Sequence, residues 1–127
     1  MIVWLEREVL LALHDAVLAT AGGEPGIADY LALEVLRLHQ VPRGSLGRDA
    51  LPAMAAAQAC ALIERRPFHA ANRATAAAAM ETFLALNGLE LAVPEEDVAV
   101  AIRAVADQDW DGSHLTAWLE ANLRPAA

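Results

Sequence analysis

Apolar residues recur at helical spacing along most of this chain, and short polar or glycine-containing segments separate the periodic stretches. The pattern predicts a first helix over about Glu6–Thr20, which ends at the turn Gly22-Gly23-Glu24-Pro25-Gly26. It predicts a second helix over about Ile27–Gln40, which ends before Val41-Pro42. The inward face of the first helix is predicted to carry Val9, Leu10, Leu13, Val17 and Leu18.

Alanine dominates the next two predicted helices, which cover about Ala50–Arg66 and Asn72–Leu86. The second of them is predicted to stop at Asn87-Gly88. Small side chains on several faces allow neighbouring helices to approach closely. We therefore expect this pair, with the short segment that joins it, to form the centre of the fold.

The C-terminal third begins with Leu89–Val93, which is either a plain link or an edge strand. Pro94 and the acids that follow it start a fifth helix. A last helix is predicted over about Ser113–Leu123, with Asp111 or Ser113 as its cap. The chain is thus predicted to be all-α, a compact bundle of about six helices in a single domain over 1–127.

Composition and charge narrow the function classes. Hydrophobic residues make up 57% of the chain, with only 7 Gly and 6 Pro, which favours helices. The net charge of −8 argues against nucleic-acid binding, for which a basic face is expected. No apolar run approaches the roughly 20 residues of a membrane span, and Met1–Glu6 lacks the pattern of a secretion signal. We expect a cytoplasmic protein that binds neither nucleic acid nor membrane.

The isolated titratable residues favour structural roles. The single Cys60 cannot form an internal disulfide and is predicted to be a small core residue. His14 and Asp15 are adjacent and do not share a helix face, so we expect packing or surface roles rather than a catalytic dyad.

Two further histidines lie near predicted helix ends. His39 needs no explanation beyond the favourable helix dipole. His114 lies close to Asp109 and Asp111, but the spacing matches no zinc or calcium loop, so these residues are predicted to form a turn and a helix cap. No metal site is expected.

Five arginines gather at two places on this acidic chain: Arg43 and Arg48 in a predicted loop over 41–49, and Arg65, Arg66 and Arg73 around the link between the alanine-rich helices. A local positive hollow there would suit a phosphate, a carboxylate or an acidic protein segment. The alternative is that these arginines are ordinary solvated cations near helix ends.

The link itself reads Arg66-Pro67-Phe68-His69-Ala70-Ala71-Asn72-Arg73-Ala74-Thr75. It resembles the signature of the Fic/Doc family, H-x-F-x-(D/E)-G-N-(G/K)-R, in which a His at one helix end leads into an anion-binding turn that starts the next helix. Three other segments are similar to the small Doc, or death-on-curing, branch: Leu11-x-Leu13-His14-Asp15, Gly22-Gly23-x-Pro25-Gly26 and Phe83-Leu84-x-Leu86-Asn87-Gly88. The resemblance implies the Fic/Doc fold over nearly the whole chain.

Phe68 and Asn72 match the signature, whereas Arg66, Ala70 and Ala74 depart from it. Arg66 stands where the family has its general-base His, and guanidinium stays protonated in proteins. Ala70 stands where the family has a metal-holding acid, and it offers no side-chain oxygen. Ala74 replaces the family's phosphate-binding Arg. The resemblance therefore implies a site without the usual metal and without ordinary Fic chemistry.

What the segment retains is an anion-binding turn at the start of a helix. Arg66 and Arg73 are predicted to supply charge, Asn72 and Thr75 to cap the helix and orient the ligand, and Phe68 to fix the loop in the core. The plainer interpretation makes Phe68 a core plug and Asn72 an N-cap.

Three functions follow from the resemblance. We expect a degenerate Doc-like protein, a pseudoenzyme whose anion-binding loop is a binding or regulatory site, in a toxin–antitoxin-type system with a small antitoxin, a protein segment or an anionic small molecule as partner. One alternative is an active Doc-like toxin that transfers phosphate or a nucleotide moiety to a protein hydroxyl, with elongation factor Tu as the implied target; only this alternative uses ATP. The other is a Fic fold adapted to different small-molecule chemistry. Arg66 and His69 are the secondary candidates for catalysis, because His69 is the nearby group that titrates near neutral pH.

Overall fold

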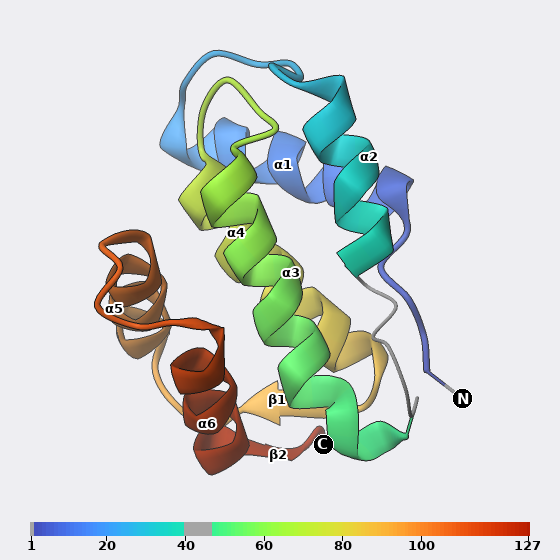
Figure 1. Ribbon diagram of the computed structural model, residues 1–127, viewed down its shortest axis with the longest axis vertical. Coiled ribbons are helices and arrows are strands. Elements are labelled where there is room, and N and C mark those ends of the chain that lie inside the picture. Colours follow the sequence, from blue (N-terminus) through green and yellow to red (C-terminus); the bar gives the residue numbers. More distant parts are fainter. Residues whose placement is uncertain (1, 40–46) are drawn as a thin grey trace.

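The computed structural model describes residues 2–39 and 47–127 (Figure 1). Within these ranges the chain forms six α-helices, a short 3-10 helix and two short strands. Their order is α1 (Arg7–Ala21), α2 (Tyr30–His39), η1 (Arg48–Ala50), α3 (Leu51–Arg65), α4 (Asn72–Leu86), β1 (Leu89–Leu91), α5 (Glu95–Ala106), α6 (Gly112–Asn122) and β2 (Leu123–Pro125). The predicted all-α class is confirmed. Arg43, most of the predicted loop over 41–49 and the side chain of His39 lie outside the described residues.

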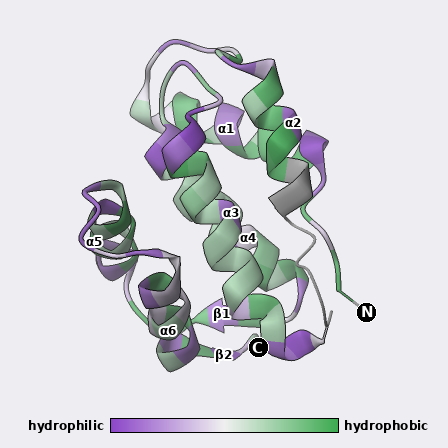
Figure 2. Ribbon diagram, in the orientation of Figure 1, coloured by the Kyte–Doolittle hydropathy of each residue, from purple (hydrophilic) through white to green (hydrophobic). Residues whose placement is uncertain are grey.

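The two alanine-rich helices form the centre, as predicted. α3 and α4 run side by side in the middle of the bundle; α1 packs on α4, α2 on α3, and α5 and α6 lie along the other side (Figure 1). Ala55, Ala59, Ala76 and Ala79 have no exposed surface, so the two helices meet over their smallest side chains. Figure 2 shows both helices as mainly hydrophobic, with a hydrophilic stretch where α3 ends and α4 begins.

Asn87 ends α4 and ties the N-terminal segment to it. Its side chain is buried; Nδ2 donates to the carbonyls of Phe83 and Val3 at 2.8 and 2.9 Å, and Oδ1 accepts from the Val3 N–H at 2.7 Å. Gly88 follows with φ +80°, a conformation that favours glycine. The predicted stop at Asn87-Gly88 is confirmed.

The second helix begins later than predicted, at Tyr30 instead of Ile27. Ile27 forms a bridge with Phe68, and the N–H groups of Ala28 and Asp29 donate to the Pro67 carbonyl at 2.8 and 3.1 Å. Asp29 then caps the helix, because its Oδ1 accepts from the Ala32 N–H at 3.0 Å. Contacts with the link between α3 and α4 therefore override the local helical pattern.

The C-terminal strand was not predicted. The edge-strand alternative for the segment after α4 is confirmed over Leu89–Leu91, and its partner is Leu123–Pro125, in antiparallel register. α6 accordingly stops at Asn122. The cap of α6 is Asp111, one of the two predicted, with Oδ1 accepting from the His114 N–H at 2.8 Å. None of the helices in the described part of the chain is long and apolar enough to cross a membrane.

Candidate functional site

The link between α3 and α4 has an unusual backbone at both ends. Arg66 ends α3 in the left-handed region at φ 48° and ψ 61°, and Ala71 precedes α4 in the same region at φ 63° and ψ 29°. Non-glycine residues rarely adopt this conformation. The surrounding contacts must therefore hold the link in shape.

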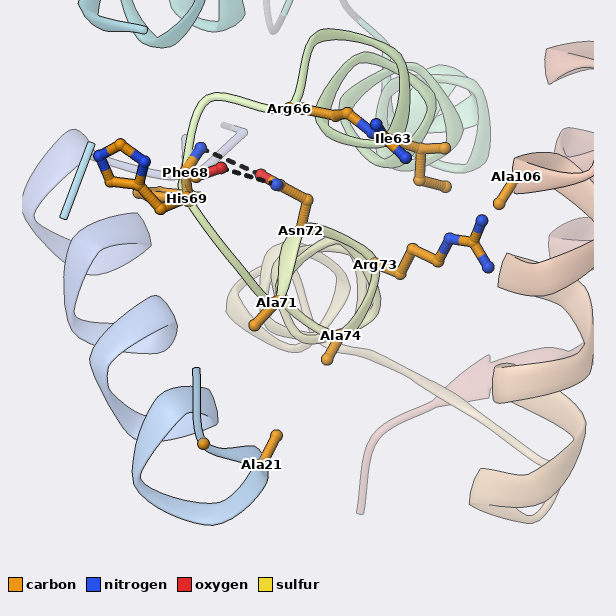
Figure 3. Close-up of a pocket in the computed structure, with 11 residues that line it drawn as sticks. Ala21, Ile63, Arg66, Phe68, His69, Ala71, Asn72, Arg73, Ala74 and Ala106 are labelled. Atoms are coloured by element: carbon orange, nitrogen blue, oxygen red, sulfur yellow. Dashed lines mark hydrogen bonds between the residues drawn. The ribbon is translucent and has the colours of Figure 1, made fainter. Parts of the chain in front are cut away.

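Asn72 supplies the first of these contacts. Its Oδ1 accepts from the Phe68 N–H at 3.1 Å, and its Nδ2 donates to the Phe68 carbonyl at 2.9 Å (Figure 3). The side chain thus bonds backward to the loop, and the N-cap position of α4 is Ala71, without a side-chain cap. The predicted capping role of Asn72 is wrong; its amide closes the loop instead.

His14 of α1 supplies the second contact that holds the link in shape. Its Nε2 donates to the Ala70 carbonyl at 3.0 Å, and its ring stacks on Phe68 with 3.8 Å between centroids and 10° between planes. Both side chains are 2% exposed. The predicted core role of Phe68 is confirmed. His14 was assigned only a packing or surface role; the sequence signal for its burial is its position four residues after Leu10, on the buried face of α1.

The turn between α1 and α2 supplies the third contact that holds the link in shape. The His69 N–H donates to the Gly26 carbonyl at 3.3 Å. A Cβ built on Gly23, whose φ is +119°, would lie only 2.8 Å from the Ala70 Cβ. The Ala70 side chain therefore faces this turn, and an acidic side chain at position 70 would displace the turn.

A cavity of about 660 Å³ lies beside the link and the start of α4. It is lined by Ala21, Gly22, Ile63, Arg66, Phe68, His69, Ala71, Asn72, Arg73, Ala74 and Ala106. Arg66 and Arg73 extend their guanidinium groups toward the side that carries Ala106 of α5, whereas the His69 ring lies on the opposite side of the loop (Figure 3). Both arginines are exposed, and neither guanidinium group has a hydrogen-bond or ion-pair partner within residues 2–39 and 47–127.

The start of α4 adds backbone donors beside these cations. The N–H groups of Asn72, Arg73 and Ala74 have no partner among the described residues, as expected for the first turn of a helix. Thr75 does not take part: it has no exposed surface, its N–H donates to the Ala71 carbonyl at 2.9 Å, and its Oγ1 has no partner in the described part of the chain. Its predicted role in capping the helix and orienting a ligand is therefore wrong.

The other titratable groups in the described residues favour neither a nucleophilic thiol nor a metal site. Burial, together with the charges of Glu64 and Asp111, raises the pKa of the Cys60 thiol to about 11. The thiol therefore stays protonated near neutral pH. No group of three or more His, Cys, Asp and Glu side chains placed to hold a metal occurs in the described residues.

We expect Ala71→Gly to stabilise the protein by up to about 1 kcal/mol. Glycine removes a left-handed strain of about 1–2 kcal/mol but adds about 0.5–1 kcal/mol of unfolded-state entropy. Urea unfolding would measure the difference. Ala70→Gly is the matched control, because residue 70 has no positive φ and should only lose stability. Equal destabilisation by both changes would show that position 71 is not strained.

No protein-family model and no curated protein matches this chain. What the site can do must therefore be inferred from its geometry. Around one cavity lie two guanidinium groups and three backbone N–H groups that have no partner among the described residues.

Proposed function

We propose that this protein is a degenerate Fic/Doc-like protein that binds an anionic ligand in the cavity beside α4 and does not transfer a group from it. The observation that carries the proposal is the convergence of Arg66 and Arg73 on one cavity at the start of α4. Two guanidinium groups without partners in the described chain, next to free N–H groups, form a setting suited to phosphate, sulfonate or carboxylate.

The form of the link supports the Fic/Doc resemblance. Ala71 adopts a left-handed conformation at the position where the family signature has Gly. Asn72 and Phe68, which match the signature, close the loop and anchor it in the core. Each of these retained residues therefore has a structural task that an anion-binding turn requires.

The departures from the signature support binding without catalysis. Arg66 cannot accept a proton, and its guanidinium lies among the cavity walls where it would repel any metal. Ala70 turns toward Gly23, so even its position is unsuited to a metal ligand. His69 lies across the loop from the arginines, which argues against it as a displaced general base.

From the resemblance to the Doc branch we further propose that this binding role belongs to a toxin–antitoxin-type system in the cytoplasm. In such a setting the cavity would serve regulation, with a small antitoxin or another protein segment as partner. This part of the proposal rests on the resemblance alone.

Calorimetric titration tests the proposal and separates it from the transferase alternative. We expect inorganic pyrophosphate and ATP to bind in EDTA as well as in Mg²⁺, because the cavity offers arginines and no acid for a metal. Binding that required Mg²⁺ would favour an active transferase. Absence of binding for both ligands under both conditions would overturn the anion-site proposal.

A further inference from the structure

A second cavity, of about 490 Å³, lies between α4 and α5. It is lined by Arg73, Ala74, Ala77, Ala78, Glu81, Glu95, Val98, Ala99, Ile102 and Arg103. Arg73 and Ala74 also line the first cavity, so the two share a wall at the start of α4. A ligand whose anionic group lies at Arg66 and Arg73 could extend from one cavity into the other.

The walls of the second cavity are mostly small and apolar, and its charges are of both signs. Glu81 comes from α4 and Glu95 from α5, while Arg73 and Arg103 are the cations that line it. No charged residue of α1, α3 or β1, the other elements packed against α4, lines this cavity. Neither arginine has an ion-pair partner within the described residues, so the carboxyl groups are not neutralised by them.

Glu81 is in an unfavourable position for a carboxylate. Its Oε1 is buried and has no hydrogen-bond partner in the described part of the chain. Burial, together with the charge and the hydrogen bond of Glu95, raises the pKa of Glu81 to about 7. Near neutral pH Glu81 is therefore partly protonated, and no arginine in the described residues forms an ion pair with it.

The same pair makes stability depend on pH. The pKa of Glu81 rises from 4.5 to about 7 on folding, so the folded state binds more protons between these values and stability falls as pH rises through this window. We expect Glu81→Gln to flatten the profile of melting temperature against pH between 4.5 and 7. An unchanged profile would mean that folding does not raise the pKa of Glu81.

We propose that the second cavity is a subsite for a protonated amine, and that the ligand of the joined cavities is a small molecule carrying both an anionic group and a primary amine. This inference rests on the proposed anion site. The anion at Arg66 and Arg73 would neutralise one of the two cations that line the second cavity, which weakens the repulsion that an incoming ammonium would meet. The ammonium would then donate to Glu81 and Glu95, and the apolar walls would contact the carbon chain between the two groups.

Binding of the amine should release a proton. An ammonium favours the form in which both carboxyl groups are ionised. The proton bound to Glu81 therefore passes to the buffer when the amine binds. Affinity for an amine-bearing ligand should therefore rise with pH through the region near neutrality. The affinity for a ligand that carries only the anionic group should not rise with pH in this way.

The test compares taurine and 3-aminopropanesulfonate with ethanesulfonate and propanesulfonate, because a sulfonate does not titrate near neutral pH. Calorimetry at about pH 6 and about pH 8, in two buffers of different ionisation enthalpy, measures both affinity and proton release. We expect at least one amine to bind about tenfold more tightly than its amine-free counterpart at the higher pH. Proton release on binding should be larger at the lower pH, where Glu81 is still mostly protonated in the free protein.

The variants Glu81→Gln and Glu95→Gln should abolish both the amine advantage and the proton release. Glu95 is exposed, so its variant remains informative if Glu81→Gln fails to fold; Glu96→Gln, which changes an exposed neighbour outside the cavity, is the matched control. Equal affinities for amine-bearing and amine-free sulfonates would overturn the subsite while leaving the anion site intact. If neither the sulfonates nor pyrophosphate binds, the anion site itself fails.

Discussion

Replacing His14 by alanine should destabilise the protein by about 2–4 kcal/mol and weaken anion binding at a cavity that His14 does not line. His14 is almost fully buried, stacks on Phe68 and donates to the Ala70 carbonyl. Its removal leaves a cavity against Phe68 and an unpaired carbonyl inside the link. The first effect is measured by urea unfolding and the second by titration with pyrophosphate.

His14→Phe separates the two contributions of this side chain. Phenylalanine can keep the stacked ring on Phe68 but cannot donate to Ala70, so it should lose only the part due to the hydrogen bond, about 1–3 kcal/mol. Asp15→Ala changes the exposed neighbour on the same helix and should be nearly neutral. If His14→Ala proved as mild as Asp15→Ala, the ring would not be holding the link.

His14 also illustrates what sequence analysis misses in this protein. Its hydrogen-bond partner is a backbone carbonyl 56 positions away, and a carbonyl carries no residue-type signal. The late start of α2 has the same origin, because Ala28 and Asp29 donate to the Pro67 carbonyl. Pairing of Leu123–Pro125 with β1 is likewise set by distant backbone groups. Long-range backbone contacts leave no periodicity or spacing to recognise.

Local signals, in contrast, were sufficient for the central features. The alanine-rich composition of α3 and α4 predicted their place in the middle, because close packing needs only small side chains. Asp111 and Asn87-Gly88 marked helix ends by their own conformational preferences.

The side chains of Asn72 and Thr75 show where local rules compete. Both residues are common near helix starts, yet the Asn72 amide finds a better pair of partners four positions earlier, on both backbone atoms of Phe68. Thr75 is turned into the core, where its N–H already has the Ala71 carbonyl. Of the residues predicted to contact the ligand, Arg66 and Arg73 are therefore the pair whose polar groups reach into the cavity.

The double variant Arg66→Gln/Arg73→Gln should lower affinity for pyrophosphate by about a hundredfold or more. A charge-assisted, bidentate contact contributes on the order of 1.5–3 kcal/mol, and each glutamine removes the charge and the guanidinium group while keeping a polar side chain. Each single change is expected to reduce affinity about tenfold. Stability should be nearly unchanged, because both side chains are exposed and have no partner in the described residues to lose.

Arg65→Gln is the control variant for this prediction, because it separates a specific site from general attraction by positive charge. Arg65 is an equally exposed cation next to Arg66, but it does not line the cavity. If the anion were attracted only by the general positive charge nearby, all the variants would bind it with similarly low affinity, and this affinity would depend strongly on salt. A specific site requires that Arg65→Gln stay close to the unmodified protein and that Arg66→Lys, which keeps the charge but loses the planar fork, recover only part of the affinity. If Arg65→Gln and Arg73→Gln reduce binding equally, the arginines act only through their summed charge, and no anion site of defined geometry exists at the start of α4.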